Sequence, residues 1–120
     1  MGKVLIIDDS KTVRDYHRYI FEDGNIQCIE AENGMEALEK IAGEKDIQLF
    51  LVDINMPIMD GYTFVGKLRE KEEYKYTPVV MVSTEAQKQD RKKAYEAGAN
   101  CYFVKPVKPD SLIQTAKILM

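Results

Sequence analysis

Acidic, hydroxyl and lysine side chains follow the ends of the apolar runs in this 120-residue chain. Carboxylates that lie within a few ångströms of one another repel, so at neutral pH they need a cation or a proton. Mg²⁺ typically takes one or two carboxylates together with water and phosphate oxygens, and a carboxylate can attack phosphorus to give an aspartyl phosphate. The residues concerned are Asp8-Asp9 after the first run, Asp53 after the third, Ser83-Thr84 after the fourth and Lys105-Pro106 after the last.

Together these residues predict phosphoryl transfer to an aspartate beside a divalent metal ion. The metal ion and Lys105 would offset the charge on the transferred phosphoryl oxygens. Taken singly, Asp9 is better explained as a turn former or helix cap, Ser83 as a turn hydroxyl and Lys105 as a surface lysine. The functional interpretation is favoured because all of them fall at the carboxyl ends of alternating strands, where open α/β sheets have their functional crevice.

The elements that must position these residues alternate between strands and helices. Near-continuous apolar runs at residues 4–7, 49–52, 79–82 and 102–104 are typical of central parallel strands that are buried on both faces. A fifth run, at residues 26–31, contains Gln27 and Glu30, which suits an edge strand.

Helical segments with start and stop signals lie between these runs. Their predicted limits are Ser10 and Gly24, Asn33 and Gly43, a start at Asp60 or Gly61, Glu85 and Gly98, and a start at Pro109. Five strand–helix repeats in 120 residues predict right-handed crossovers and a sheet that is covered on both faces. We therefore expect residues 1–120 to form one doubly wound α/β domain.

Composition excludes several classes of function. A net charge of −3 and a pI near 5.2 argue against direct nucleic-acid binding by this domain. The apolar run near the N-terminus is too short for a signal peptide or a membrane span, and two cysteines are too few for a disulfide scaffold. The expectation is a cytoplasmic protein without membrane association, in which Cys28 and Cys101 stay unbridged.

Four stretches carry a resemblance to a known family: VLIIDDS at residues 4–10, DINMPIMDG at 53–61, MVSTEA at 81–86 and AGANCYFVKP at 97–106. They resemble the receiver domains of two-component response regulators, in particular the single-domain chemotaxis type, CheY. The resemblance spans essentially the whole chain. It implies a flavodoxin-like three-layer sandwich with a five-stranded parallel sheet in the order 2-1-3-4-5, and a phosphorylation-dependent signalling switch rather than an enzyme.

The resemblance also implies a role for each residue at the phosphorylation site. By position, Asp53 is the phosphoacceptor. Asp8, Asp9, Asp53 and the backbone carbonyl of Asn55 are the implied protein ligands of Mg²⁺, with Mn²⁺ as an alternative ion. Lys105 contacts the phosphoryl oxygens, and its bond to the following proline is implied to be cis.

A second set of residues is implied to transmit the signal. Ser83 is the switch hydroxyl, preferred over its neighbour Thr84, and its movement is coupled to inward rotation of Tyr102. The alternative for Tyr102 is an ordinary half-buried strand aromatic. The coupling is a population shift that reshapes the face made by the fourth helix, fifth strand and fifth helix. Asn55 and Glu85 tune dephosphorylation, and this pair is similar to that of chemotaxis receivers with a short-lived phosphoryl group.

The implied phosphodonor is the phosphohistidine of a sensor kinase or phosphotransfer protein. His17, the only histidine of this chain, is interpreted as a packing residue. Two interpretations of the output stay open: a stand-alone chemotaxis-like regulator that binds a target protein, or a receiver with a fused output domain. The oligomeric state is expected to be a monomer or a phosphorylation-dependent dimer.

Two other classes fit the sequence less well. A phosphatase of the haloacid-dehalogenase type needs Asp-x-Asp after its first strand, whereas Asp8 and Asp9 are adjacent here. A flavodoxin-like cofactor binder needs a loop rich in Ser, Thr or Gly at that position, and two aspartates would repel the cofactor phosphate.

Overall fold

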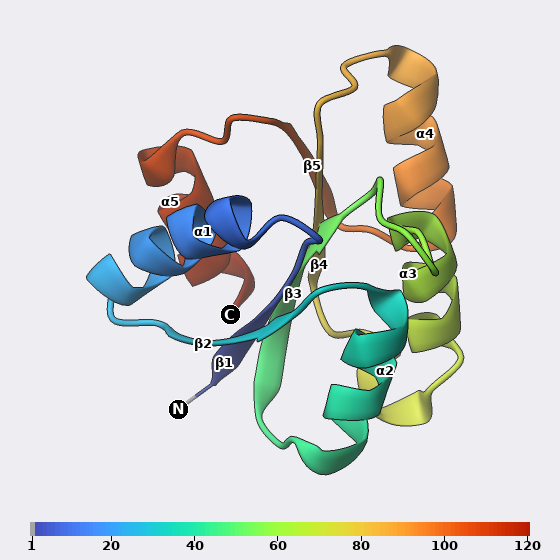
Figure 1. Ribbon diagram of the computed structural model, residues 1–120, viewed down its shortest axis with the longest axis horizontal. Helices are drawn as coiled ribbons and strands as arrows, with labels where there is room; N and C mark the ends of the chain where they lie inside the picture. The colour runs from blue at the N-terminus through green and yellow to red at the C-terminus, as the bar shows by residue number, and fades with distance from the viewer. Residues whose placement is uncertain (1) are drawn as a thin grey trace.

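The computed structural model describes residues 2–120 as a parallel sheet between two layers of helices (Figure 1). The strand order is β2-β1-β3-β4-β5, as expected, and every neighbouring pair is parallel. Helices α1 and α5 cover one face of the sheet, and α2, α3 and α4 cover the other (Figure 1). The strands are β1 (Lys3–Ile7), β2 (Gln27–Ala31), β3 (Ile47–Asp53), β4 (Val79–Ser83) and β5 (Cys101–Val104).

The first three helices begin close to the predicted starts because polar side chains cap them. Ser10 Oγ accepts a hydrogen bond from the Val13 amide at 3.3 Å, and Asn33 and Asp60 cap the next two helices in the same way. Each cap satisfies an amide that has no partner within the helix. The helices are α1 (Lys11–Asp23), α2 (Gly34–Gly43), α3 (Gly61–Arg69), α4 (Lys88–Ala97) and α5 (Pro109–Leu119), with a short 3₁₀ turn, η1 (Glu72–Tyr74).

The structure corrects three details of the sequence interpretation. Helix α4 begins at Lys88 rather than at Glu85, because both backbone groups of Glu85 are bound by side chains outside the helix. Gly43 is the last residue of α2 and not its stop, which is Glu44. The η1 turn was not predicted; Tyr74 there packs edge-on against Phe50, with 5.4 Å between the ring centroids.

Two apolar cores, one on each face of the sheet, explain why the strand sequences are continuous rather than alternating. Leu5 and Ile7 of β1 enter the core beneath α2, α3 and α4. Val4 and Ile6 enter the core beneath α1 and α5. Burial of each such side chain contributes about 1.5–3 kcal/mol. Helices therefore pack on both faces of the sheet, and this packing fixes the positions of the carboxyl ends of its strands.

The cysteines and the helices also bear on the sequence predictions. Cys28 and Cys101 are free thiols on β2 and β5, the two edges of the sheet, which confirms that they do not bridge. Within residues 2–120, every helix is too short or too polar to cross a membrane.

Candidate metal and phosphoacceptor site

Three carboxylates meet at the carboxyl edge of the central strands. The register pairs Ile7 of β1 with Val52 of β3, which brings Asp8 beside Asp53. One oxygen from each of Asp8, Asp9 and Asp53 lies within 4.8 Å of the other two. Asp8 and Asp53 are only 2% and 4% exposed, whereas Asp9 is exposed to solvent. This all-oxygen donor set, open on one side, fits a hard divalent cation that keeps some of its water.

Lys105 lies against two of these carboxylates. It follows β5, and its ammonium is 2.9 Å from Asp8 Oδ2 and 3.0 Å from Asp53 Oδ1. Its amide donates to the carbonyl of Ser83 at 2.8 Å, which ties the segment after β5 to the end of β4. The bond from Lys105 to Pro106 is cis, as the resemblance implied. A positive charge is thus fixed at the acidic cluster by the backbone as well as by ion pairs.

The pKa of Asp53 indicates that its surroundings do not fully offset the cost of burying its negative charge. Burial raises the pKa of Asp53 to about 6; Asp8 and Asp9 add to this rise, and Lys105 opposes it. Burial lowers the pKa of Lys105, but its hydrogen bonds to Asp8 and Asp53 outweigh burial, and the net shift is upward. One ammonium therefore does not fully compensate the buried carboxylates, and a divalent ion would do so.

The predicted switch residues are connected through the backbone of Glu85. Ser83 is buried at the end of β4, and its Oγ accepts a hydrogen bond from the Glu85 amide at 3.0 Å. Tyr102 of β5 is 5% exposed, and its hydroxyl donates to the Glu85 carbonyl at 2.7 Å. The guanidinium of Arg91 lies 5.0 Å from the centroid of the Tyr102 ring. Tyr102 is therefore turned inward in this structure, and the backbone of Glu85 connects it to Ser83.

Asn55 and Glu85 are exposed near the two strand ends that carry Asp53 and Ser83. Asn55 lies in the loop after β3, and Glu85 lies in the segment between β4 and α4. Their influence on dephosphorylation and the ligand role of the Asn55 carbonyl stay predictions.

The sequence did not predict a role for Arg14, which holds the backbone of Asp8 in place. Arg14 of α1 is buried; its Nη1 donates to the backbone carbonyl of Asp8 at 2.8 Å, and its Nε donates to Glu30 Oε1 at 2.9 Å. It thus fastens the turn that carries the acidic pair to β2. The available signal was its spacing, since Arg14 shares a helical face with His17 and Phe21 at intervals of three and four residues.

His17 is buried on α1, as the packing interpretation expected, and burial lowers its pKa from 6.5 to about 4. The folded protein therefore binds fewer protons at His17 than the unfolded chain does between these two values. Stability should fall as the pH decreases through this window, by up to about 3 kcal/mol from this group alone.

We expect the His17→Leu variant to lose this part of the acid sensitivity. Urea unfolding of wild type and variant between pH 7 and pH 4 measures it, and the carboxylates common to both proteins cancel in the difference. Because His17 is the only histidine, equal pH dependence of the two proteins would contradict a neutral, buried imidazole.

Comparisons with known proteins agree with this geometry. The sequence matches the family model of the response regulator receiver domain over residues 4–117. It is 36% identical to chemotaxis protein CheY1 of Helicobacter pylori, over 98% of this chain and 96% of that protein. It is 34% identical to transcriptional regulatory protein SrrA of Staphylococcus aureus, over 99% of this chain but only 48% of that protein.

Among solved structures, chemotaxis protein CheY4 of Vibrio cholerae superimposes with a TM-score of 0.93 at 32% identity, over 100% of this chain and 99% of that one. The fold, the family match and the near-full-length relatives lead to one conclusion. The chain belongs to the response regulator receiver domains, the phosphoacceptor switches of two-component signalling.

Proposed function

We propose that Asp53 is the residue that receives the phosphoryl group, in a single receiver domain comprising residues 1–120. The observation that carries the proposal is the meeting of Asp8, Asp9 and Asp53 within 4.8 Å, with Lys105 paired to two of them. Asp8, Asp9, Asp53 and the Asn55 carbonyl would hold Mg²⁺ or Mn²⁺. When bound, the ion supplies positive charge that offsets the carboxylates and the phosphoryl oxygens.

The side chains of this site have distinct tasks in the transfer. An Asp53 oxygen attacks the phosphorus of a phosphohistidine, and the phosphorus–nitrogen bond to the donor imidazole breaks. The Lys105 ammonium, already 3.0 Å from Asp53 Oδ1, is in reach of the new phosphoryl oxygens. It neutralises their charge without first being desolvated, because it is half-buried beforehand.

The output switch is proposed to run from Ser83 to Tyr102. When the Ser83 hydroxyl turns toward the phosphoryl group, its bond with the Glu85 amide is released or shifted. The Glu85 carbonyl, which accepts from the Tyr102 hydroxyl, moves with that amide. The position of Tyr102 then selects between states of the face formed by α4, β5 and α5.

The partners follow from this function. A sensor histidine kinase or phosphotransfer protein would supply the phosphoryl group, and a target protein or fused output domain would read the α4-β5-α5 face. The relatives include CheY1, which the chain matches over nearly the whole of that protein, and SrrA, which it matches over about half of that protein. A stand-alone regulator and a fused one both stay compatible with this chain.

Labelling by a small phosphodonor tests the proposal directly. With acetyl phosphate and Mg²⁺ we expect one phosphoryl group per chain, stable in mild acid and released by hydroxylamine, as for an acyl phosphate. Chelation with EDTA should abolish labelling, and added Mg²⁺ in excess should restore it. Intact mass spectrometry measures both. Labelling that is unaffected by chelation would show that the acidic cluster does not act through a metal ion.

The lifetime of the phosphoryl group is a separate prediction. Asn55 and Glu85 are exposed beside the strand ends that carry Asp53 and Ser83, where they can influence the approach of water. We expect a half-life of seconds to minutes in Mg²⁺ buffer, and a several-fold change in the Glu85→Lys variant. Phosphate release after rapid removal of the donor gives the rate. Persistence for many hours would refute this prediction.

A further inference from the structure

Asp8 and Asp9 are adjacent in the chain but have different surroundings. Asp8 is 2% exposed, whereas Asp9 is exposed to solvent. Each nevertheless offers an oxygen to the same acidic cluster, in which the oxygens lie within 4.8 Å of one another. A peptide group is planar, so its orientation fixes where the two residues that it joins lie relative to each other. The peptide between Asp8 and Asp9 therefore decides whether both carboxylates can meet at one ion.

The oxygen of this peptide group is held by Arg14 of α1. Arg14 is 8% exposed, and its Nη1 donates to the Asp8 carbonyl at 2.8 Å. Hydrogen bonds from a charged donor are stronger than those between neutral groups. The Nε of the same guanidinium donates to Glu30 Oε1 of β2 at 2.9 Å. Because the guanidinium is a planar fork, its bond to β2 sets the position from which it holds the Asp8 carbonyl.

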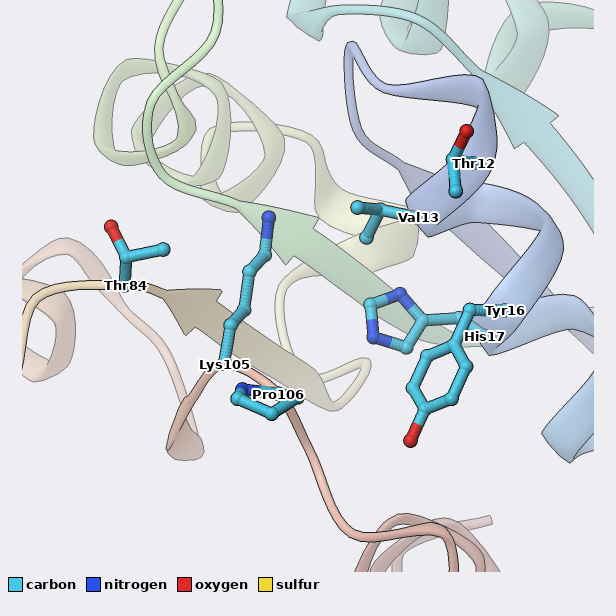
Figure 2. Close-up of a pocket in the computed structure, with 7 residues that line it drawn as sticks. All are labelled: Thr12, Val13, Tyr16, His17, Thr84, Lys105 and Pro106. Atoms are coloured by element: carbon cyan, nitrogen blue, oxygen red, sulfur yellow. The ribbon is translucent and has the colours of Figure 1, made fainter.

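Other contacts hold the carboxylate of Asp8. Its Oδ1 accepts a hydrogen bond from the Ser10 amide at 2.9 Å. Its Oδ2 accepts from Lys105, whose side chain extends toward the end of β3 (Figure 2). These two bonds place the carboxylate but do not involve the peptide that leads to Asp9. The bond from Arg14 is made to that peptide, so it couples the placement of one carboxylate to that of the next.

The charge of Arg14 does not explain its position beside Asp8, because a guanidinium close to a cation site repels the cation. The charge is also matched locally. Burial raises the pKa of Glu30, but its hydrogen bonds from Arg18 and Arg14 outweigh burial, and the net shift is downward. Glu30 is therefore ionised at neutral pH and offsets the positive charge beside it. What Arg14 provides at Asp8 is a fixed hydrogen bond.

Arg18 offers a comparison within the same ion-pair cluster. It lies one turn of α1 after Arg14, its Nη1 donates to Glu30 Oε2, and its Nη2 donates to the Cys28 carbonyl at 3.1 Å. Arg18 thus carries the same charge and shares the same glutamate, but it binds β2 rather than the Asp8 peptide. Replacing either arginine by an apolar residue changes the charge of the cluster equally. A difference between the two variants therefore reports on the Asp8 peptide.

We propose that Arg14 is a positioning residue that fixes the relative placement of Asp8 and Asp9 and thereby favours Mg²⁺ over Ca²⁺. This inference rests on the metal site of the proposed function. Mg²⁺ requires near-ideal octahedral geometry with short bonds, whereas Ca²⁺ accepts longer bonds and irregular geometry. A peptide held by a buried guanidinium limits the movement of both carboxylates, which favours the ion that tolerates less movement. When this hold is lost, the site adapts to the larger ion and loses affinity for the smaller one.

Arg14→Met tests the inference, because methionine keeps a long apolar side chain and removes the guanidinium. We expect the Kd for Mg²⁺ to rise at least about tenfold, as is usual when a group that orients a metal ligand is lost. The Kd for Ca²⁺ should rise less than about threefold, because Ca²⁺ accepts the altered geometry. The ratio of the Ca²⁺ constant to the Mg²⁺ constant should therefore fall at least about threefold.

Titration with MgCl₂ alone and with CaCl₂ alone, at constant ionic strength, gives both constants without phosphoryl transfer. The backbone amide signals of Asp8, Asp9 and Asp53 in NMR spectra report binding at the acidic cluster. Spectra of the metal-free proteins establish beforehand that each variant is folded.

Arg18→Met is the matched control and should keep the wild-type ratio. Its loss of one positive charge should strengthen the binding of both ions slightly and alike. If Arg14→Met does not fold, Arg14→Lys takes its place. The lysine ammonium keeps the charge but is a point donor rather than a planar fork, so the ratio should still fall at least about threefold.

Two results would overturn the inference while the metal site stands. One is an unchanged ratio in the Arg14 variant, since equal weakening of both ions would indicate a purely structural role. The other is the same fall in the ratio for Arg18→Met. If the wild type shows no saturable Mg²⁺ shifts at Asp8, Asp9 and Asp53, the metal site itself is refuted, and the inference with it. The two failures are thus distinguishable.

Discussion

Replacing Asp53 by Asn is expected to reduce labelling by acetyl phosphate at least about a thousandfold, to background. The amide has nearly the shape of the carboxylate, but it lacks the anionic oxygen that attacks phosphorus. Asp53 is 4% exposed at the end of β3, so the change removes the nucleophile while the surrounding packing is kept. Intact mass spectrometry after incubation with acetyl phosphate and Mg²⁺ measures the effect.

Asp60→Asn is the matched control for this experiment. Asp60 lies seven positions later and caps α3 through a bond from the Thr63 amide at 2.9 Å, a task that asparagine performs equally well. We expect full labelling of Asp60→Asn. Undiminished labelling of Asp53→Asn, with the label mapped to another carboxylate, would disprove the assignment of Asp53.

The same variant has a second expected effect, on stability. The folded-state pKa of Asp53 is raised to about 6 from an ordinary value of 3.8, so the folded protein holds this proton more tightly than the unfolded chain. Ionisation of Asp53 therefore lowers the free energy of unfolding. This loss is absent below pH 3.8, grows as the pH rises toward about 6, and is complete above that value. Without metal at pH 7.5, Asp53→Asn should raise the free energy of unfolding by up to about 3 kcal/mol. Urea unfolding with and without Mg²⁺ measures this change.

Replacing Lys105 by Ala is the second large effect. Its ammonium is 2.9 Å from Asp8 and 3.0 Å from Asp53, and its removal leaves two buried carboxylates without their cation. We expect the metal-free protein to lose about 3 kcal/mol of stability. The raised pKa of Lys105 means that this contribution is present below its unfolded pKa, and hence in full at pH 7.5. Mg²⁺ should still bind and should restore most of the loss.

Loss of Lys105 should also separate phosphorylation from its output. Without the ammonium, the phosphoryl group at Asp53 is held less firmly, and Ser83 has no fixed partner to turn toward. We expect no phosphorylation-dependent change at Tyr102, as read from its ring signals in NMR spectra. Lys108→Ala, an exposed position three residues later, serves as the control and should behave like wild type. A normal Tyr102 response in Lys105→Ala would disprove the charge role.

Much of the fold was predictable because its signals are local. Continuous apolar runs such as residues 79–82 arise because each central strand is buried on both faces, and β4 is buried at all five of its positions. Caps such as Ser10 and Asn33 are read from residue type alone. The late start of α4 was not predictable, because it depends on bonds from Ser83 and Tyr102 to the backbone of Glu85.

The meeting of Asp8, Asp9 and Asp53 also followed from the sequence, since the carboxyl ends of neighbouring parallel strands share one edge. Only the tertiary structure decided what surrounds them. Lys105 pairs with Asp8 and Asp53, which lie 97 and 52 residues earlier in the chain. Arg14 donates hydrogen bonds both to the Asp8 carbonyl and to the Glu30 carboxylate. Such contacts join side chains from separate elements, and their geometry is fixed by how the helices pack on the sheet. The sequence by itself determines where the strands lie and which residues stand at their ends. Tertiary packing determines which charges pair, and it leaves the Nδ1 atom of His17 without a hydrogen-bond partner among the described residues.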